Sequence, residues 1–115
     1  MSGYRGVDLD GTIAHYDGWK DDGHIGDPVP IMVNRVKKWL ANKEEVRIVT
    51  ARAFGRGSET SIKNIKAWCL KHFGQELAVQ CHKDFGMIEL WDDRAVTVEI
   101  NTGRVLGSNN HADTA

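Results

Sequence analysis

The stretch Gly6-Val7-Asp8-Leu9-Asp10-Gly11-Thr12 places two carboxylates two residues apart, where an apolar strand runs out into a glycine turn. Side chains at positions i and i+2 of a strand share a face, so Asp8 and Asp10 would repel each other unless the chain breaks at Leu9 or Gly11. Two such anions require either a cation between them or a shared proton. The stretch therefore predicts a metal-assisted site, and the alternative is a plain polar turn after a strand.

The chain on either side of this stretch alternates strands with helices. Numbered along the chain, the expected strands cover residues 4–9, 45–50, 77–80, 87–91 and 95–100. Asp27-Pro28 is expected to open a helix, with Asp27 as N-cap, and a second helix is expected over about 59–73, with Gly74 as its stop. This alternation predicts an α/β fold with a three-layer, Rossmann-like and mostly parallel sheet in the strand order 5-4-1-2-3.

Apolar residues at helical spacing predict which helix faces are buried. In the first helix these residues are Ile31, Val33, Val36, Trp39 and Leu40, and in the second they are Ile62, Ile65, Trp68, Cys69 and Phe73. Near the end of the chain, residues 101–103 are expected to form a hairpin turn into residues 104–106. Each helix is thus predicted to pack one apolar face against the core.

Polar residues stand at the carboxyl ends of three predicted strands. Asp8 and Asp10 stand at the end of the first strand, Thr50 ends the second, and Asp92-Asp93 follow the fourth. Parallel sheets of this kind bind ligands beyond the carboxyl ends of their strands, where the strand order reverses. We therefore expect these side chains to meet in one site.

Residues 12–27, here called the flap, contain three glycines and show no lasting hydrophobic period. We expect this flap, with the short 53–58 loop, to lie over the site. Trp19 is expected to pack against the base of the flap, with contact to a ligand as the alternative. His15, His24 and His82 are expected on the surface, with the same alternative. Residues 1–106 are predicted to form one domain, followed by a polar, disordered tail at 107–115.

Composition excludes several classes of protein. The chain has 115 residues, of which 41% are hydrophobic and 27% are charged, as in a soluble globular domain. No apolar run approaches the length of a membrane span, and the start lacks the apolar core of a signal peptide, so we expect a cytoplasmic protein with no membrane partner. A net charge of −1 offers no electrostatic footprint for duplex nucleic acid.

Two cysteines do not make a disulfide framework in a chain with no secretory signal. Cys69, His72, Cys81 and His82 bring four potential zinc ligands close in the sequence, but their spacing matches no common zinc finger. A buried thiol on an amphipathic helix is the expected state of Cys69.

Four segments resemble, in their order and spacing, the motifs of the haloacid dehalogenase superfamily of phosphohydrolases. They are Val7-Asp8-Leu9-Asp10-Gly11-Thr12, Val49-Thr50-Ala51-Arg52, Lys83, and Leu90-Trp91-Asp92-Asp93-Arg94. The resemblance implies a Mg²⁺-dependent phosphomonoester hydrolase that acts through an aspartyl-phosphate. An acid at Asp10 suits an alkoxide leaving group better than a halide, and the chain has no room for a cap domain. A minimal member with an open site is therefore expected.

The resemblance also implies a role for each residue. Asp8 would be the nucleophile, and Asp10 would be the general acid and then the general base. Mg²⁺ would be held by Asp8, the backbone carbonyl of Asp10, and Asp92, with Asp93 supporting that metal shell. Phosphoryl oxygens would be bound by Thr50 with Ala51 and Arg52, and their charge would be offset by Lys83, for which Lys71 is the fallback.

Two other interpretations stay open at this point. One is a phosphatase domain for nucleic-acid ends, with Lys20, Arg52 and Arg56 around the mouth of the site, and the other is a phosphate-binding or partner-docking module without turnover. The small-molecule interpretation expects a phosphorylated metabolite as substrate. A homo-oligomer, in which a second subunit closes the open site, is compatible with each of them.

Overall fold

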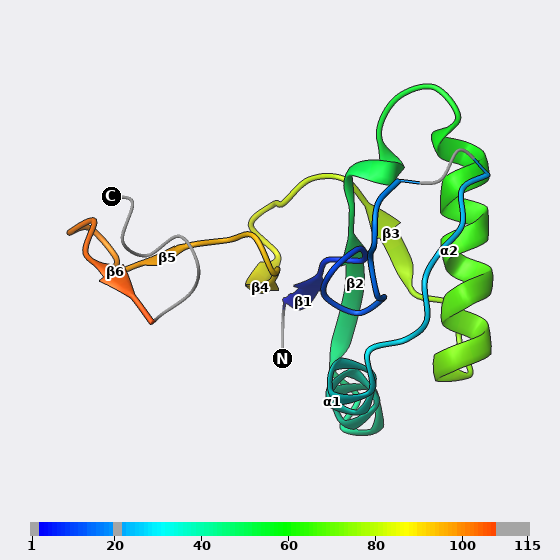
Figure 1. The fold of residues 1–115 in the computed structure, drawn as a ribbon. Coiled ribbons are helices and arrows are strands. Elements are labelled where there is room, and N and C mark those ends of the chain that lie inside the picture. Colours follow the sequence, from blue (N-terminus) through cyan, green and yellow to red (C-terminus); the bar gives the residue numbers. More distant parts are fainter. Residues whose placement is uncertain (1–2, 20–21, 108–115) are drawn as a thin grey trace.

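The computed structural model of the protein describes residues 3–19 and 22–107, so most of the predicted tail and Lys20 lie outside the described residues. Four strands form one parallel sheet in the order β3-β2-β1-β4 (Figure 1). Their bounds are Tyr4–Val7 for β1, Glu45–Val49 for β2, Ala78–Gln80 for β3 and Met87–Trp91 for β4. The Rossmann-like α/β fold and the predicted order of these four strands are confirmed.

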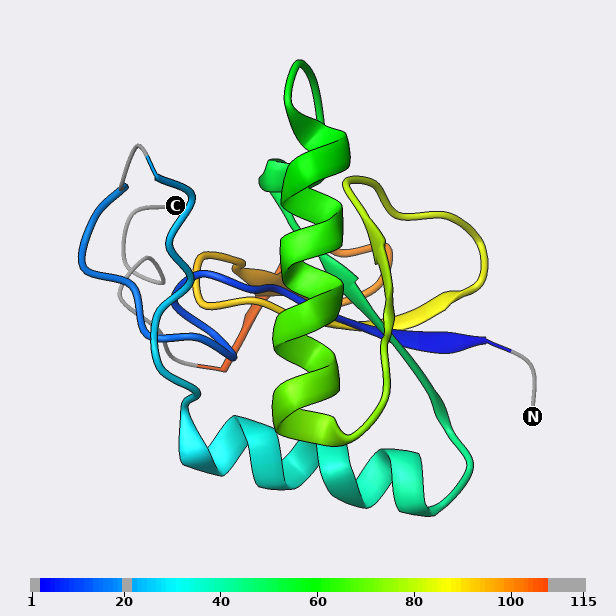
Figure 2. The ribbon, with the colours of Figure 1, turned by 90° about the vertical axis from the view of Figure 1, so that its right-hand side faces the viewer.

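The two helices, α1 (Pro30–Ala41) and α2 (Ser58–Phe73), cover one face of this sheet. Val7 of β1 lies beside Ile48 of β2, and both are fully buried. Their core cluster includes Val33 and Val36 of α1 and Ile65 and Cys69 of α2. Figure 2 looks onto this side of the molecule, with α2 in front of the strands. Both helices therefore pack on the same layer of strand side chains.

The opposite face of the sheet has no helical cover within the described residues, which corrects the predicted three-layer arrangement. Leu90 lies beside Gly6 on that face and is 42% exposed. The reason is the short link from β3 to β4, because residues 81–86 leave no room for a crossover helix. Within residues 3–19 and 22–107, the helices thus cover one side of the sheet.

Helix α1 begins later than predicted. Its N-cap is Val29 and its first residue is Pro30, rather than Asp27 and Pro28. Pro28 instead forms an antiparallel bridge with Ala14, and Val29 donates its N–H to Ile13 O at 2.9 Å. A residue that precedes proline is also disfavoured in the helical region, which keeps Val29 extended.

The buried face of α1 is the predicted one except at its start, because Val33 and Val36 are buried and Trp39 and Leu40 pack against the core. Met32 is buried together with Val33 and Val36, whereas Ile31 is exposed. In α2, Ile65 and Cys69 are buried as predicted, and Gly74 ends the helix with a φ of 79°. A left-handed residue at this position is a common helix stop because glycine adopts it without a steric penalty.

The predicted fifth strand does not join the sheet. Residues Thr97–Val98 form β5, which pairs antiparallel with β6 (Val105–Leu106) in a separate ribbon. Between them, Asn101 and Gly103 have φ values of 67° and 80°, so the predicted turn is confirmed. This ribbon projects to the side of the sheet in Figure 1. The backbone groups of β5 form their hydrogen bonds with β6, so β5 needs no partner strand in the sheet.

Within the described part of the chain, no helix has both the length and the apolar character of a membrane span.

Candidate functional site

Three neighbouring strands deliver polar residues to one edge of the sheet. Asp8, Thr50 and Asp92 come directly after the last residues of β1, β2 and β4. The β1–β4 pairing continues by one bond, because Asp8 N donates to Trp91 O at 2.9 Å. A pocket of about 980 Å³ opens at this edge, and its walls include Asp8, Asp10, Thr50 and Asp93. The structure therefore brings these predicted site residues together.

The carboxylates of Asp8, Asp92 and Asp93 form a cluster in which one oxygen from each lies within 4.8 Å of the others. Thr12 Oγ1 holds two of them, since it lies 3.0 Å from Asp93 Oδ1 and 3.3 Å from Asp8 Oδ2 and accepts the Asp93 N–H at 2.9 Å. Carboxylate oxygens are the ligands that hard divalent cations prefer. The donor set thus fits a metal ion of this kind.

Glycine at position 11 is needed for this arrangement. Gly11 has a φ of 88°, and a Cβ atom there would lie 2.7 Å from Asp93 Oδ2. A larger residue would therefore be strained and would displace a carboxylate of the cluster. The glycine turn that the sequence predicts at this position agrees with this geometry.

Burial raises the pKa of Asp8 to about 7, and a hydrogen bond to Asp93 and the negative charges of Asp92 and Asp93 add to the shift. The carboxylate is thus disfavoured in its ionised form unless a cation is present. The sequence predicts repulsion between Asp8 and Asp10 unless the chain breaks at Leu9 or Gly11. Leu9 and Gly11 lie in turns, and the like charges that act on Asp8 belong to Asp92 and Asp93.

Asp10 turns away from this cluster and pairs with Arg52. Arg52 Nε donates to Asp10 Oδ2 and Arg52 Nη2 donates to Asp10 Oδ1, each at 2.8 Å. The Arg52 side chain is only 8% exposed. Its backbone N–H donates to Thr50 Oγ1 at 3.2 Å, which caps the short 3₁₀ turn Ala51–Ala53. Both oxygens of Asp10 are therefore occupied by one guanidinium.

Arg52 also holds the flap in place. It donates to Gly23 O at 3.1 Å and to His24 O at 3.0 Å, and its guanidinium lies 4.9 Å from the centre of the Trp19 ring. Trp19 lines the pocket and is 57% exposed, so the expectation that it packs on the base of the flap is not met. Arg52 thus links the end of β2, the carboxylate of Asp10 and the flap.

The far end of the flap is anchored to the core. Trp68 of α2 donates its Nε1–H to Gly26 O at 3.1 Å. A Cβ atom on Gly26 would lie 1.9 Å from His15 O, so the two arms of the flap approach as closely as glycine permits. His15, His24 and His82 are exposed, as expected for surface histidines.

Neither candidate lysine lines the pocket. Lys83 lies in the exposed loop between β3 and β4, and Lys71 is exposed on α2. A lysine paired with Asp8 would lower the pKa of that carboxyl, whereas the arrangement raises it. Among the described residues, the cations in the pocket wall are Arg52, Arg56 and Arg94. The role of Lys83 stays a prediction.

The four potential zinc ligands do not form a cluster. Cys69 is buried, and burial raises the pKa of its thiol to about 11, whereas Cys81 is exposed. Within the described residues, the acidic group around Asp8 is the one cluster suited to a metal ion, and it contains no cysteine or histidine. The buried thiol predicted for Cys69 is confirmed.

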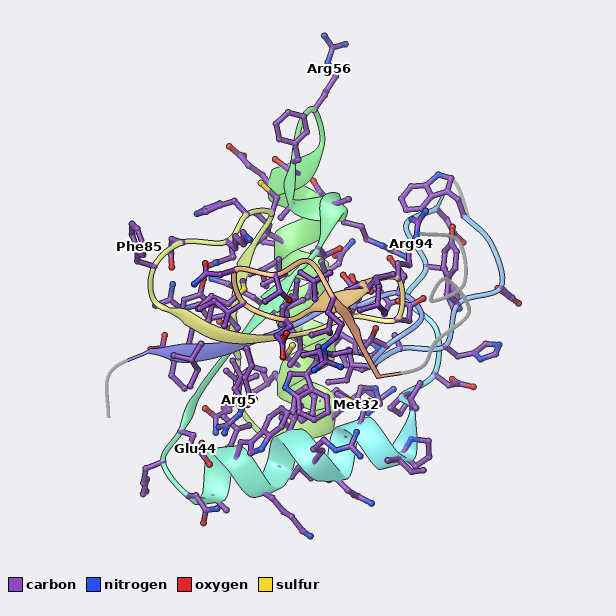
Figure 3. The ribbon with its side chains drawn as sticks, turned by 90° about the vertical axis from the view of Figure 1, so that its left-hand side faces the viewer. Arg5, Met32, Glu44, Arg56, Phe85 and Arg94 are labelled. Atoms are coloured by element: carbon purple, nitrogen blue, oxygen red, sulfur yellow. The ribbon has the colours of Figure 1, made fainter. Side chains whose placement is uncertain are left out.

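Sequence reasoning did not single out Tyr16 or Phe54, although both line the pocket. Each is an aromatic residue in or beside a glycine-rich segment that contacts the site, and that combination was the available signal. Arg94 also lines the pocket, and Figure 3 places it on the flap side of the molecule, with Arg56 at the outer tip of the 53–58 loop.

Comparisons with known proteins give a fold and no family. No protein-family model matches the chain, and no curated protein matches it. Among solved structures, the chain is similar to a conserved protein from Bacteroides thetaiotaomicron, with a TM-score of 0.57 and 22% sequence identity over 84% of this chain and 79% of that one. This likeness supports the α/β fold described above.

Proposed function

We propose that this protein is a phosphomonoester hydrolase of the haloacid dehalogenase type, which depends on Mg²⁺ and forms an aspartyl-phosphate on Asp8. The observation that carries the proposal is the cluster of Asp8, Asp92 and Asp93 beside Thr50 at the carboxyl edge of the parallel sheet. Hydrolysis of a phosphate ester by a carboxylate needs a cation and hydrogen-bond donors around the phosphoryl oxygens. This edge has three carboxylates suited to binding the cation, and the hydroxyl of Thr50 as a donor.

The carboxylates of Asp8, Asp92 and Asp93 and the backbone carbonyl of Asp10 would hold the cation. When bound, Mg²⁺ would neutralise these carboxylates and the phosphoryl oxygens, which otherwise repel the nucleophile. Asp93 thereby receives a more direct part than the sequence predicted, because its oxygen belongs to the cluster. Burial raises the pKa of Asp8, and the neighbouring charges of Asp92 and Asp93 add to the shift. A bound cation would favour the ionised form of this carboxyl and so offset the shift.

The first step would transfer the phosphoryl group to the protein. An Asp8 oxygen attacks phosphorus, the bond from phosphorus to the ester oxygen breaks, and Asp10 gives its proton to the leaving oxygen. In the second step a water attacks phosphorus and gives its proton to Asp10. The bond from phosphorus to Asp8 then breaks, which releases phosphate and restores both carboxyl groups. Thr50 would donate its hydroxyl hydrogen to a phosphoryl oxygen in both steps.

Arg52 must change partners for this sequence to run. In the described conformation both oxygens of Asp10 accept hydrogen bonds from Arg52, so neither is available to hold a proton for the leaving group. A phosphoryl group competes well for a guanidinium because it can also accept two parallel hydrogen bonds. Substrate would thus draw Arg52 from Asp10 and loosen its bonds to Gly23 and His24.

A second candidate function is a phosphate-binding module without turnover. The ion pair between Asp10 and Arg52 favours it, as does the absence of Lys71 and Lys83 from the pocket wall. Such a module would bind inorganic phosphate or a phosphate ester in the presence of Mg²⁺ and release the ester unchanged. Calorimetric binding combined with product analysis separates the two functions.

The test of the main proposal is a screen of several dozen phosphate esters, an aryl phosphate among them, with phosphate release as the measurement. We expect activity with Mg²⁺, none after EDTA, recovery on adding Mg²⁺, and inhibition by Ca²⁺. Ca²⁺ prefers more ligands at longer distances, so Asp8 would bind it with both oxygens and lose its attacking lone pair. Undiminished activity in EDTA would refute the metal site.

A further inference from the structure

Three aromatic side chains line the pocket with much of their surface in solvent. Tyr16, Trp19 and Phe54 are 47%, 57% and 77% exposed. Tyr16 and Trp19 belong to the flap, whereas Phe54 belongs to the 53–58 loop, so the aromatics reach the pocket from two separate segments. Exposed apolar side chains that gather at a cleft mark a surface that a ligand covers.

The same pocket has polar side chains suited to the rest of an organic ligand. Thr60, Ser61 and Asn64, from the first two turns of α2, line its wall and offer hydroxyl and amide groups. The pocket measures about 980 Å³, at the upper end of the range for small-molecule sites and far more than a phosphoryl group fills. Aromatic, hydroxyl and amide groups thus line the part of the pocket that is available to the leaving group of the ester.

We infer that the substrate is a nucleotide, with its phosphate at Asp8 and its base against Phe54 and the aromatic residues of the flap. This inference rests on the proposed phosphatase function and names its substrate class. Every nucleobase has a flat π-face that stacks on aromatic side chains, and its edge and the ribose hydroxyls pair with groups such as those of Thr60 and Asn64. A sugar phosphate or an alkyl phosphate leaves the aromatic residues uncovered.

The stacking surface serves a free nucleotide and the end of a single strand equally. The net charge of −1 provides no basic face for a duplex, so any strand would be held near its end. The shared chemistry is one stacked base next to one terminal phosphate. The experiment therefore includes both sources as separate arms.

The first test compares adenosine 5′- and 3′-monophosphate with ribose 5-phosphate, which has a phosphate and a ribose but no base. We expect kcat/KM to be at least about tenfold higher for one of the nucleotides, the size of effect that stacking of one base provides. A 5′- and a 3′-phosphorylated pentanucleotide form the second arm, and preference for one of them over the mononucleotides assigns the site to strand ends. Equal kcat/KM for the nucleotides and ribose 5-phosphate overturns the inference.

The second test locates the base with a matched pair of variants. Phe54→Ala should reduce the preference for the nucleotide over ribose 5-phosphate about fivefold or more, because it removes one stacking surface. Phe85→Ala is the control, since Phe85 is a fully exposed aromatic on the opposite side of the molecule from Arg94 in Figure 3 and does not line the pocket. An unchanged preference in Phe54→Ala contradicts the assigned position of the base.

A binding measurement separates failure of this inference from failure of the proposed function. Asp8→Asn removes the nucleophile and keeps the aromatic walls, so calorimetry with Mg²⁺ measures the affinity of the same ligands without turnover. We expect the preferred nucleotide to bind at least about tenfold more tightly than ribose 5-phosphate. Tighter nucleotide binding by a wild-type protein that hydrolyses no ester supports the inference and refutes the phosphatase. Hydrolysis of esters without any preference for those that carry a base supports the phosphatase and refutes the inference of a nucleotide substrate.

Discussion

Asp8 and Asp10 are two residues apart in the chain, yet they lie in opposite electrostatic surroundings. Asp8 is clustered with Asp92 and Asp93, and its pKa is raised to about 7. Asp10 instead receives two hydrogen bonds from Arg52. The first carboxylate is therefore suited to a bound cation, whereas the second is already paired with the guanidinium of Arg52. One half of the site is suited to a metal ion, and the other half is linked to the flap through Arg52.

The largest effect should come from removing the Asp8 carboxylate. Asp8→Asn is nearly isosteric but cannot attack phosphorus, so we expect turnover to fall by at least about 10³-fold while circular dichroism stays that of the wild type. Glu76→Gln, which changes an exposed carboxylate outside the pocket, is the control and should keep full activity. Substantial activity in Asp8→Asn would remove the nucleophile from the proposed mechanism.

Asp10→Asn should reduce kcat by an amount that depends on the leaving group, which distinguishes the role of Asp10 from that of Asp8. We expect a loss of about 10²–10³-fold in kcat with an alkyl phosphate but only about tenfold with an aryl phosphate, because a good leaving group needs little proton donation. The measurement is kcat for both esters with wild type and variant side by side. Equal losses for the two esters would refute the acid role of Asp10.

The raised pKa of Asp8 predicts how stability changes with pH in the metal-free protein. Below about pH 4 this carboxyl is protonated in both the folded and the unfolded chain. As the pH rises from about 4 to 7, the unfolded chain loses the proton while the folded protein retains it, so the free energy of unfolding falls. We expect a loss of about 1–3 kcal/mol after solvent screening is allowed for, complete above pH 7.

Urea unfolding of the wild type and of Asp8→Asn across pH 4–8 measures this loss. The difference between the two proteins isolates Asp8 from the other titrating groups, and it should be large at pH 8 and small at pH 4. Mg²⁺ at pH 8 should stabilise the wild type more than the variant, because the cation binds the ionised carboxylate. If the difference in free energy of unfolding between the two proteins does not vary with pH, the pKa of Asp8 is not raised by its surroundings in the folded protein.

The smallest effect concerns Arg52. Arg52→Lys keeps the charge but cannot donate to both oxygens of a carboxylate or phosphate in parallel, so we expect KM to rise about five- to tenfold. Arg104→Lys is a matched control, because Arg104 makes a similar two-bond pair with Glu99 on the β5–β6 ribbon and does not line the pocket. The same kinetic change in both variants would show that Arg52 has no special role.

The sequence predicted the framework of the fold well. Alternating strands and helices specified a parallel sheet, and the four strands that form it have the predicted order. The prediction missed the bare face of the sheet, which follows from the short link between β3 and β4. It also missed the separate β5–β6 ribbon, which depends on how segments pair at a distance. Residues 95–100 have the composition of a strand, and composition does not specify which strand will be the partner.

The candidate site divides in the same way. The order of the motifs placed Asp8, Thr50 and Asp92 at the carboxyl ends of three strands, and parallel pairing brings such ends together, so this part followed from the sequence. The clustering of Asp93 with Asp8 and the ion pair of Asp10 with Arg52 depend on the folded arrangement of distant segments. The rule that residues i and i+2 share a face holds within a strand, and β1 ends at Val7. Beyond that point the direction of each carboxylate depends on the hydrogen bonds of the turn and on distant charges, which local sequence does not specify.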